Sequence, residues 1–411
     1  MIMEFVQVTS IWPYFLTSAA FLVIASLLSS TQKFYRDLLD VDLTSNRFKS
    51  IDGLRGFLAL AVYFHHAIIS YFYYKTGQWE LPPSKFYLLL GQFGVALFFM
   101  ITAFLFWLKG SNAKSHLSAQ QFLWARLMRL SPMYLISVSL VIAISFFETD
   151  FKLQEPILRI GKELLTWSSF GFLIPMDINQ FSETTIINSV YWSLAYEWCF
   201  YLILPLILIF SRGMAFILLI TIVSLLIFCF SVRQVEWNFL CGILAAEIVK
   251  NDRIKYHIWY KWPVSLIILL SFCVFFTEFP SGYGGWQSIT LLIAFTCIAK
   301  GNSVFGILTC RAARFLGSIS YSIYLIHCII LFVFLKTLNN VQPIVLLTPV
   351  EYWTVVATCG ALVIFVCSFS YRFIEHTSMR FSLPKWLDTR TEKLIFVQPV
   401  ITDVHESSKV K

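Results

Sequence analysis

The sequence predicts an all-α, polytopic membrane protein, and three observations support this fold class. Of the 411 residues, 58% are hydrophobic and only 13% are charged, whereas an ordinary soluble domain carries about 25% charged residues. The mean hydropathy is +0.73. Apolar stretches of about 20 residues, the length that crosses a bilayer as a helix, recur along the chain. The same composition excludes a disordered chain, a collagen, a small disulfide scaffold and a nucleic-acid-binding protein.

Eleven apolar segments are expected to cross the membrane. In chain order they are Ile11–Ser30, Gly56–Tyr74, Phe86–Leu108, Ser131–Phe147, Val190–Phe210, Met214–Val232, Trp237–Val249, Trp262–Phe279, Gln287–Ala299, Phe315–Leu335 and Tyr352–Tyr371. The seventh and ninth are short for a crossing, so a re-entrant or protein-buried helix is the alternative for each. The first lacks the basic flank of a signal peptide and is expected to remain as an extra helix.

The positions of the basic residues predict the orientation. If the N-terminus lies outside, 24 of the 31 Lys and Arg residues fall in cytoplasmic segments, as the positive-inside rule requires. We therefore expect the C-terminus in the cytoplasm and the protein in the plasma (inner) membrane. The net charge of +8 then reflects topology more than an anionic partner.

Three parts of the chain follow from these spans. Residues 1–50 are expected to form an extra transmembrane helix and a cytoplasmic linker, residues 51–380 one membrane domain, and residues 381–411 a cytoplasmic tail. Eight of the nine cysteines fall inside the apolar spans, and the chain contains no Cys-x-x-Cys pair. We expect these thiols to pack as small hydrophobic groups, and we expect no metal site.

Ionisable residues at membrane depth are costly to bury and are therefore candidates for a functional site. Arg55 and His66 are eleven residues apart, about three helical turns, so they share one face of the second span. His66 lies about 15 Å into the membrane, and its neighbour His65 points about 100° away. An imidazole that titrates near neutral pH suits a general base. A structural histidine bonded to a neighbouring helix, with Arg55 as a boundary charge, is the alternative.

Two further spans carry polar side chains at helical spacing. Ser193 and Glu197 are four residues apart on one face of the fifth span, and a carboxylate at that depth needs a partner. In the tenth span, Ser320, Tyr324 and His327 follow a spacing of three to four residues. Polar helix–helix contacts explain this stripe equally well for Ser320 and Tyr324. We expect His327 to form part of a cavity wall.

Arg126 and Arg129 lie three residues apart, directly before the fourth span. Paired guanidinium groups match phosphate oxygens through bidentate hydrogen bonds. A topology signal or a contact with membrane lipid headgroups is the alternative for this pair.

Taken in order, these motifs resemble the acyltransferase-3 family of integral membrane O-acyltransferases. The resemblance rests on Asp-Gly-Leu-Arg-Gly at 52–56, the Arg55–His66 spacing, Arg-x-x-Arg at 126–129, Trp-Ser-Leu-x-x-Glu at 192–197, Leu-Gly-x-Ile-Ser-Tyr-Ser-x-Tyr-Leu-x-His at 316–327, and Ser-Tyr-Arg-Phe-Ile-Glu at 370–375. It covers about Ile51 to Arg380. It implies a ten-helix core, with Ile11–Ser30 as an addition.

The resemblance also implies a reaction. Family members are thought to transfer acyl groups, usually acetyl from acetyl-CoA, to hydroxyl groups of extracytoplasmic or lipid-linked glycans. Carried over by motif position, His66 is the catalytic histidine with Arg55 as its partner, and Arg126 and Arg129 hold the phosphates of coenzyme A. Acyl-CoA is then a co-substrate, and no permanently bound cofactor is expected.

The remaining polar residues complete the expected site. Glu197 is placed with the catalytic group, where it binds the acceptor or orients an imidazole, and Ser193, Tyr324 and His327 are expected to contact substrate. A transporter or flippase for a sugar or a lipid-linked intermediate is the rival class, because central polar residues also suit a transport pathway. We find no convincing internal repeat of the kind that transporters usually show.

Overall fold

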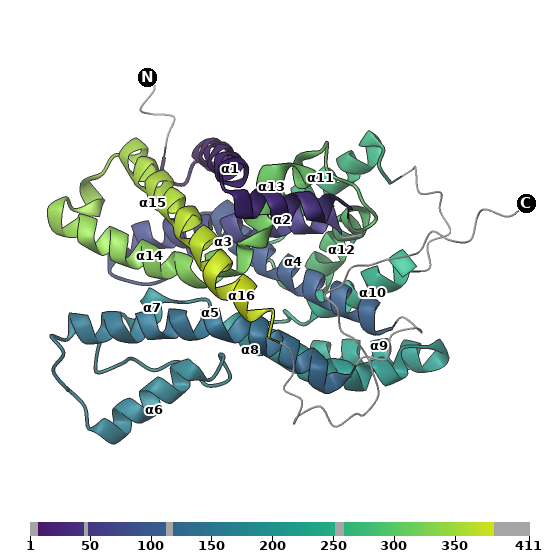
Figure 1. The fold of residues 1–411 in the computed structure, drawn as a ribbon, viewed down its shortest axis with the longest axis horizontal. Helices are drawn as coiled ribbons and strands as arrows, with labels where there is room; N and C mark the ends of the chain where they lie inside the picture. Colours follow the sequence, from purple (N-terminus) through teal and green to yellow (C-terminus); the bar gives the residue numbers. More distant parts are fainter. Residues whose placement is uncertain (1–6, 45–47, 112–117, 251–258, 382–411) are drawn as a thin grey trace, which may run out of the picture.

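The computed structural model describes residues 7–44, 48–111, 118–250 and 259–381, and within them it contains helices and no strand (Figure 1). The long helices are α1 (Trp12–Thr31), α2 (Lys33–Thr44), α3 (Lys49–Thr76), α4 (Lys85–Gly110), α5 (Ala119–Glu148), α6 (Ile157–Ser168), α8 (Trp192–Ile207), α9 (Gly213–Phe230), α10 (Trp237–Lys250), α11 (Trp262–Glu278), α12 (Gly285–Ala299), α14 (Ser320–Val341) and α15 (Pro349–Ser370). The short ones are α7 (Thr184–Ile187), η1 (Leu208–Phe210), η3 (Ile307–Thr309), α13 (Arg311–Ser318), η4 (Ile344–Leu346), η5 (Tyr371–Glu375) and α16 (His376–Ser378).

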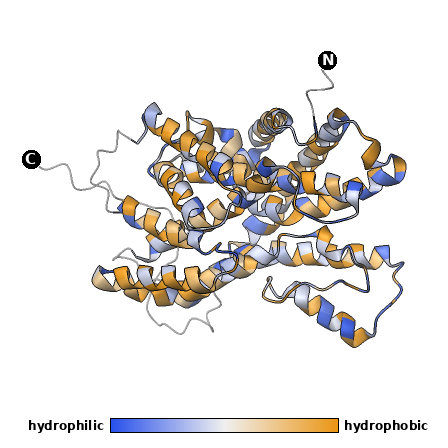
Figure 2. Ribbon diagram, turned by 180° about the vertical axis from the view of Figure 1, so that it is seen from behind, coloured by the Kyte–Doolittle hydropathy of each residue, from blue (hydrophilic) through white to orange (hydrophobic). Residues whose placement is uncertain are grey.

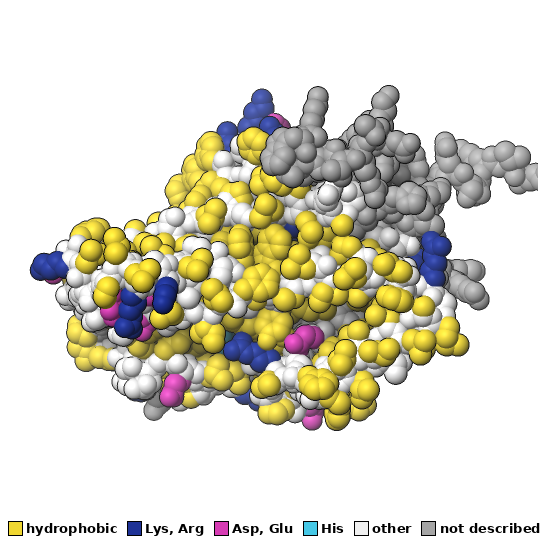
Figure 3. All heavy atoms as spheres, turned by 90° about the horizontal axis from the view of Figure 1, so that it is seen from below, with side chains coloured by type: hydrophobic (Ala, Val, Ile, Leu, Met, Phe, Trp, Pro, Cys, Tyr) yellow, Lys and Arg dark blue, Asp and Glu magenta, His cyan; other side chains and the backbone are white. Residues whose placement is uncertain are grey.

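The all-α, polytopic prediction is confirmed. In the described ranges, eight helices are long and apolar enough to cross a membrane, and α11 and α12 are shorter apolar helices. The two short predicted spans are helices α10, of 14 residues, and α12, of 15 residues. Hydrophobic residues occur along most of the described helices (Figure 2). In the face drawn in Figure 3, hydrophobic side chains dominate and charged ones form small groups, as expected for a surface that contacts lipid.

Two element boundaries differ from the prediction. The segment Phe315–Leu335 is two helices, because α13 ends at Ser318 and α14 begins at Ser320. The helix that contains the fourth predicted span begins well before Ser131, since α5 starts at Ala119 and includes Pro132. Hydropathy ends a predicted span at charged residues, whereas backbone hydrogen bonds continue where the charges face a protein cavity instead of lipid.

Glycines let α3 approach the segment around α13 very closely. A Cβ atom on Gly53 would lie 1.8 Å from the Leu308 carbonyl oxygen, and one on Gly317 would lie 1.8 Å from the Asp52 carbonyl oxygen. A Cβ atom on Gly56 would lie 2.8 Å from the Ala313 carbonyl oxygen. Real Cβ atoms do not approach backbone so closely, so only glycine fits. The Asp-Gly-Leu-Arg-Gly motif therefore sets the position of α3.

Helix α3 forms the centre of the fold. It packs against α4, α13 and α14, and every residue from Leu58 to Ser70 is buried. At its far side, the Tyr63 hydroxyl donates to the Val356 carbonyl and the Tyr352 hydroxyl donates to the Ala67 carbonyl. These bonds tie α3 to α15 and hold the face that carries His66 toward α14.

The C-terminal motif closes the bundle. Helix α15 runs into a π-helix, η5, in which Glu375 is fully buried. Its carboxylate accepts a hydrogen bond from Ser322 of α14, and Ser370 donates to the same hydroxyl at 2.8 Å. The polar ends of α14 and α15 are thereby joined inside the protein.

Candidate functional site

One cavity gathers polar residues of α3, α4, α5, α8 and α14. It encloses about 810 Å³ of unfilled space, including its open mouth. Its polar lining consists of Arg55, Thr102, Arg126, Arg129, Ser193, Glu197, Tyr201, Ser320, Tyr321 and Tyr324. Three guanidinium groups and one carboxylate thus face the same space.

Arg126 and Arg129 enter this cavity from consecutive turns of α5. The guanidinium of Arg126 lies 4.6 Å from the centre of the Phe106 ring, and its Nε–H is buried without a hydrogen-bond partner among the described residues. Arg129 donates to the thioether sulfur of Met379 at 2.9 Å, a weak acceptor. Because a buried guanidinium group prefers a charged partner, the pair is suited to an anion that enters the cavity.

Glu197 is held by α8 and α4. Its carboxylate accepts hydrogen bonds from Tyr201, four residues further along α8, and from Thr102 of α4 at 3.4 Å. Ser193, one turn earlier, is 2.6 Å from the hydroxyl of Tyr324. The carboxylate predicted to need a partner therefore has two, and Ser193 links α8 to α14.

A second cavity lies on the other side of these residues. It is narrow, since its 320 Å³ of unfilled space includes open solvent at its mouth, and it is lined by His66, Ser70, Tyr73, Tyr74, Trp79, Ile186, Cys328, Leu331, Phe332 and Leu335. The lining residue Tyr73 donates a hydrogen bond to Glu183, which also accepts one from Lys336 at 3.0 Å. The Trp79 ring lies parallel to the His66 ring, with 6.5 Å between their centres. We call the arginine-lined space the inner cavity and this one the outer cavity, after the orientation that the basic residues predict.

The two cavities come close along one face of α14. Tyr324 lines the inner cavity and Cys328 lines the outer one. They are four residues apart, a rise of about 6 Å along a helix. The boundary between an arginine-rich space and an aromatic space is therefore about one helical turn thick.

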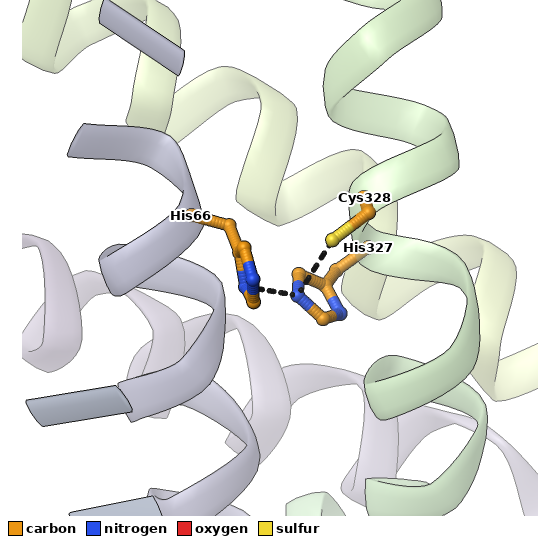
Figure 4. Close-up of side chains that lie close together, drawn as sticks. All are labelled: His66, His327 and Cys328. Atoms are coloured by element: carbon orange, nitrogen blue, oxygen red, sulfur yellow. Dashed lines mark hydrogen bonds between the residues drawn. The ribbon is translucent and has the colours of Figure 1, made fainter. Parts of the chain in front are cut away.

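At this boundary, His66 of α3 contacts His327 of α14 (Figure 4). The Nδ1 atom of His327 lies 2.8 Å from the Ile323 carbonyl oxygen, which can only accept, so Nδ1 of His327 carries a hydrogen. In a neutral ring its Nε2 is then an acceptor. Nδ1 of His66 lies 3.0 Å from Nε2 of His327 and 3.0 Å from the Val62 carbonyl oxygen. Because both of these atoms are acceptors, Nδ1 of His66 carries the hydrogen. The remaining nitrogen of His66, Nε2, holds the free lone pair of a base.

The thiol of Cys328 completes this group. Its Sγ atom is 3.3 Å from Nε2 of His327 (Figure 4). The ligand atoms of His66, His327 and Cys328 all lie within 4.8 Å of one another, and these residue types at that spacing can hold a metal ion. The expectation that the protein has no metal site stays a prediction.

His65 faces a different neighbour. Its Nδ1 donates to the Tyr87 carbonyl at 2.7 Å, and its ring packs where a Cβ on Gly91 would stand. This residue joins α3 to α4 and lines neither cavity.

Six of the eight predicted site residues line the inner cavity: Arg55, Arg126, Arg129, Ser193, Glu197 and Tyr324. His66 lines the outer cavity, so Arg55 and His66 share α3 but open into different spaces. His327 is fully buried and lines neither cavity; it lies directly against His66.

Among the cavity residues that sequence reasoning missed, three bear on the site. Tyr201 is four residues after Glu197, a spacing that signals a shared face. Cys328 follows His327 directly, but its apolar surroundings favoured a packing role. Trp79 lies in the connection between α3 and α4, and no sequence signal places it over His66.

A bundle of apolar helices with a buried histidine pair between two cavities defines an integral membrane protein with a chemical site at mid-bundle. The family described as "Acyltransferase domain" matches residues 48–372, and the chain therefore belongs to this acyltransferase family. The expected resemblance is confirmed.

A curated relative is similar over much of the chain. The Bacillus subtilis (strain 168) protein named "Putative peptidoglycan O-acetyltransferase YrhL" is 26% identical over 383 residues, which cover 79% of this chain. The alignment covers 54% of that relative, so the chain spans about half of its length. No solved structure matches the chain.

Proposed function

We propose that this protein is a membrane O-acetyltransferase that moves an acetyl group from acyl-CoA, bound from the cytoplasm, to a hydroxyl group of a glycan at the outer face. The observation that carries the proposal is the pair of cavities, one rich in arginine and one rich in aromatic residues, which approach each other at the His66–His327 pair. Membership in the acyltransferase family supports the reaction class.

The inner cavity suits the donor. The phosphates of coenzyme A are multiply charged, and guanidinium groups bind phosphate oxygens through paired hydrogen bonds. Arg126 offers a buried N–H without a partner in the described chain, and Arg129 and Arg55 line the same space. The positive-inside distribution of Lys and Arg supports a cytoplasmic mouth for this cavity. The N-terminus is then outside and the C-terminus inside.

The outer cavity suits the acceptor. Its aromatic side chains offer flat apolar faces of the kind that bind a sugar ring, and Glu183, bonded to the lining residue Tyr73, adds a carboxylate beside them. Because the space is little larger than a water molecule, it must widen to admit a sugar. The name of the Bacillus relative favours a peptidoglycan glycan as the acceptor.

The transfer step follows from the tautomer of His66. The acceptor hydroxyl gives its proton to Nε2 of His66 while its oxygen attacks the thioester carbonyl carbon. The carbon–sulfur bond breaks, and the departing sulfur takes the proton back. During the step, His327 stabilises the transient imidazolium because its Nε2 accepts the Nδ1–H of His66. A thioester is already activated, so the acyl transfer needs no nucleotide hydrolysis.

The test is an assay of the purified full-length protein with radiolabelled acetyl-CoA and soluble peptidoglycan fragments. Acetylated fragments are the expected product. If the protein, reconstituted in vesicles, moves the glycan across the bilayer without acetylating it, the rival transporter class holds.

A further inference from the structure

Cys328 is a nucleophile for which the transfer step above has no role. It lies on α14, is only 3% exposed, and lines the outer cavity beside His66. Its Sγ atom is 3.3 Å from Nε2 of His327 and 3.8 Å from the hydroxyl of Ser189. Among the described residues, which include all nine cysteines, it is the only one hydrogen-bonded to an imidazole.

This arrangement matches an activated nucleophile. Such a nucleophile lies within hydrogen-bond reach of a base, and a third group orients the base. The Ile323 carbonyl accepts the Nδ1–H of His327 at 2.8 Å, so Nε2 of His327 is the acceptor, and its one lone pair faces both the thiol at 3.3 Å and the Nδ1–H of His66 at 3.0 Å. Cys328, His327 and Ile323 therefore supply the nucleophile, the base and the orienting group.

An acyl donor that reaches His66 also reaches Cys328. The ligand atoms of the two side chains lie within 4.8 Å of each other, and both line one cavity. Tyr324, which borders the inner cavity, lies one helical turn before Cys328 on the same face. A thioester that extends from the inner cavity past Tyr324 therefore meets the sulfur at the boundary.

We propose that Cys328 carries the acyl group between the donor and the acceptor; this inference rests on the proposed acyl-CoA donor. While the Nδ1–H of His66 keeps its hydrogen bond to the Val62 carbonyl, Nε2 of His327 takes the proton of the thiol, and the sulfur attacks the thioester carbonyl carbon of acyl-CoA. The bond to the coenzyme A sulfur breaks, and that sulfur leaves with the proton from His327. The acceptor hydroxyl then gives its proton to His66, and its oxygen attacks the Cys328 thioester. The released cysteine sulfur regains a proton.

Chemistry and geometry both favour this order. The first step exchanges one thioester for another, so its free-energy change is small, and a cysteine sulfur is intrinsically more nucleophilic than a hydroxyl oxygen. A carrier at the boundary also lets the donor and the acceptor bind in separate cavities at separate times. Coenzyme A is then able to leave the inner cavity before a glycan occupies the outer one.

The experiment uses the full-length protein in lipid nanodiscs with radiolabelled acetyl-CoA and no acceptor. We expect an acetyl group on the peptide that contains Cys328, identified by mass spectrometry and removed by neutral hydroxylamine. We also expect exchange of labelled coenzyme A into acetyl-CoA, which occurs without an acceptor only when the enzyme holds the acyl group. Addition of peptidoglycan fragments is expected to transfer the label to the glycan.

Three variants sharpen this test. Cys328→Ala is expected to lose the label and the exchange, and to acetylate glycan as slowly as His66→Ala. Cys328→Ser keeps the size of the side chain and is expected to accumulate a hydroxylamine-resistant oxygen ester. The matched control is Cys297→Ala on α12, a buried cysteine away from both cavities, which keeps the label.

The outcomes separate the two proposals. Glycan acetylation by the wild type without label or exchange, or a Cys328→Ala protein as active as the wild type, overturns the carrier role and leaves the proposed function standing. Label and exchange without acetylated glycan support the carrier role and contradict the glycan acceptor.

Discussion

Single hydrogen bonds decide which atoms can act as acid or base in this protein. The tautomers of His66 and His327 are fixed by two backbone carbonyls, those of Val62 and Ile323. Each carbonyl belongs to the residue four positions earlier on the same helix. The helix backbones therefore hold His66 in one tautomer, with its free lone pair on Nε2, before any substrate binds.

Replacing each of the adjacent histidines tests this assignment. His66→Ala is expected to lower acetyl transfer by about 10²- to 10⁴-fold, the usual contribution of a general base. His65→Ala removes a contact between α3 and α4 and is expected to retain more activity. Transfer rates of the two purified proteins provide the measurement, and near-normal rates in both would refute the role of His66.

His327 acts through His66 as a positioning residue in the transfer to the acceptor. In His327→Gln the amide oxygen is able to accept the Nδ1–H of His66, whereas in His327→Leu no acceptor remains. We expect kcat to fall strongly in the leucine variant and partly recover in the glutamine variant, with KM for the acceptor little changed. The ratio of kcat in the two variants is the measurement. Recovery in the glutamine variant supports the positioning role, whereas equal losses are expected if His327 must take the thiol proton of Cys328.

The arginine pair is expected to act on donor binding alone. Replacing Arg126 and Arg129 by Glu reverses the charge of the inner cavity and should weaken acyl-CoA binding much more than glycan binding. Arg212→Glu, at an exposed residue before α9, is the control for an arginine-to-glutamate change outside the cavity. Calorimetry with acetyl-CoA gives the affinity, and an unchanged value in the double variant would remove the pair from the donor site.

At the scale of elements, the glycine contacts between α3 and α13 set how the histidine and arginine residues face each other. A backbone approach of this kind leaves no room for a methyl group. Because α3 carries both Arg55 and His66, a small displacement of this helix alters both cavities at once.

Two alanine substitutions give opposite expectations. Gly56→Ala places a Cβ 2.8 Å from the Ala313 carbonyl oxygen, and overpacking of this kind costs about 1 to 3 kcal/mol. Gly161→Ala on α6 meets nothing within 4 Å and is expected to gain up to about 1 kcal/mol from helix propensity. Thermal unfolding in detergent provides the comparison, and equal midpoints would contradict the packing argument.

Spacing along single helices was enough to predict several features of the site. It placed Arg55 with His66 on one helix and Ser193 with Glu197 on another, and the structure shows both pairs on α3 and α8. The contact between His66 and His327 joins residues 261 positions apart. Helix periodicity says nothing about such a pair, because it depends on how α3 and α14 pack. The break at Ile319 was missed because it lies between two serines inside one stretch that is apolar on average, and mean hydropathy does not show where one helix ends and the next begins.

At the scale of the whole molecule, the orientation in the membrane decides which cavity meets which substrate. We expect the exposed thiol of Cys310 to react with a membrane-impermeant maleimide only after cells are permeabilised. A cysteine introduced at Gln180, in the connection between α6 and α7, is expected to react in intact cells. The reverse pattern would place the arginine-rich cavity at the outer face and contradict the proposed donor route.

Helix α9 packs only loosely against the rest of the bundle, since Ile227 is the only buried residue among its 18. The position of α9 in the bundle depends more on surrounding lipid than on protein contacts. Its stability is therefore expected to change with the detergent or lipid used to solubilise the protein. Harsh detergents are expected to release α9 before they disturb α3 and α14. Preparations that keep a ring of native lipid are therefore the appropriate starting material for experimental structure determination.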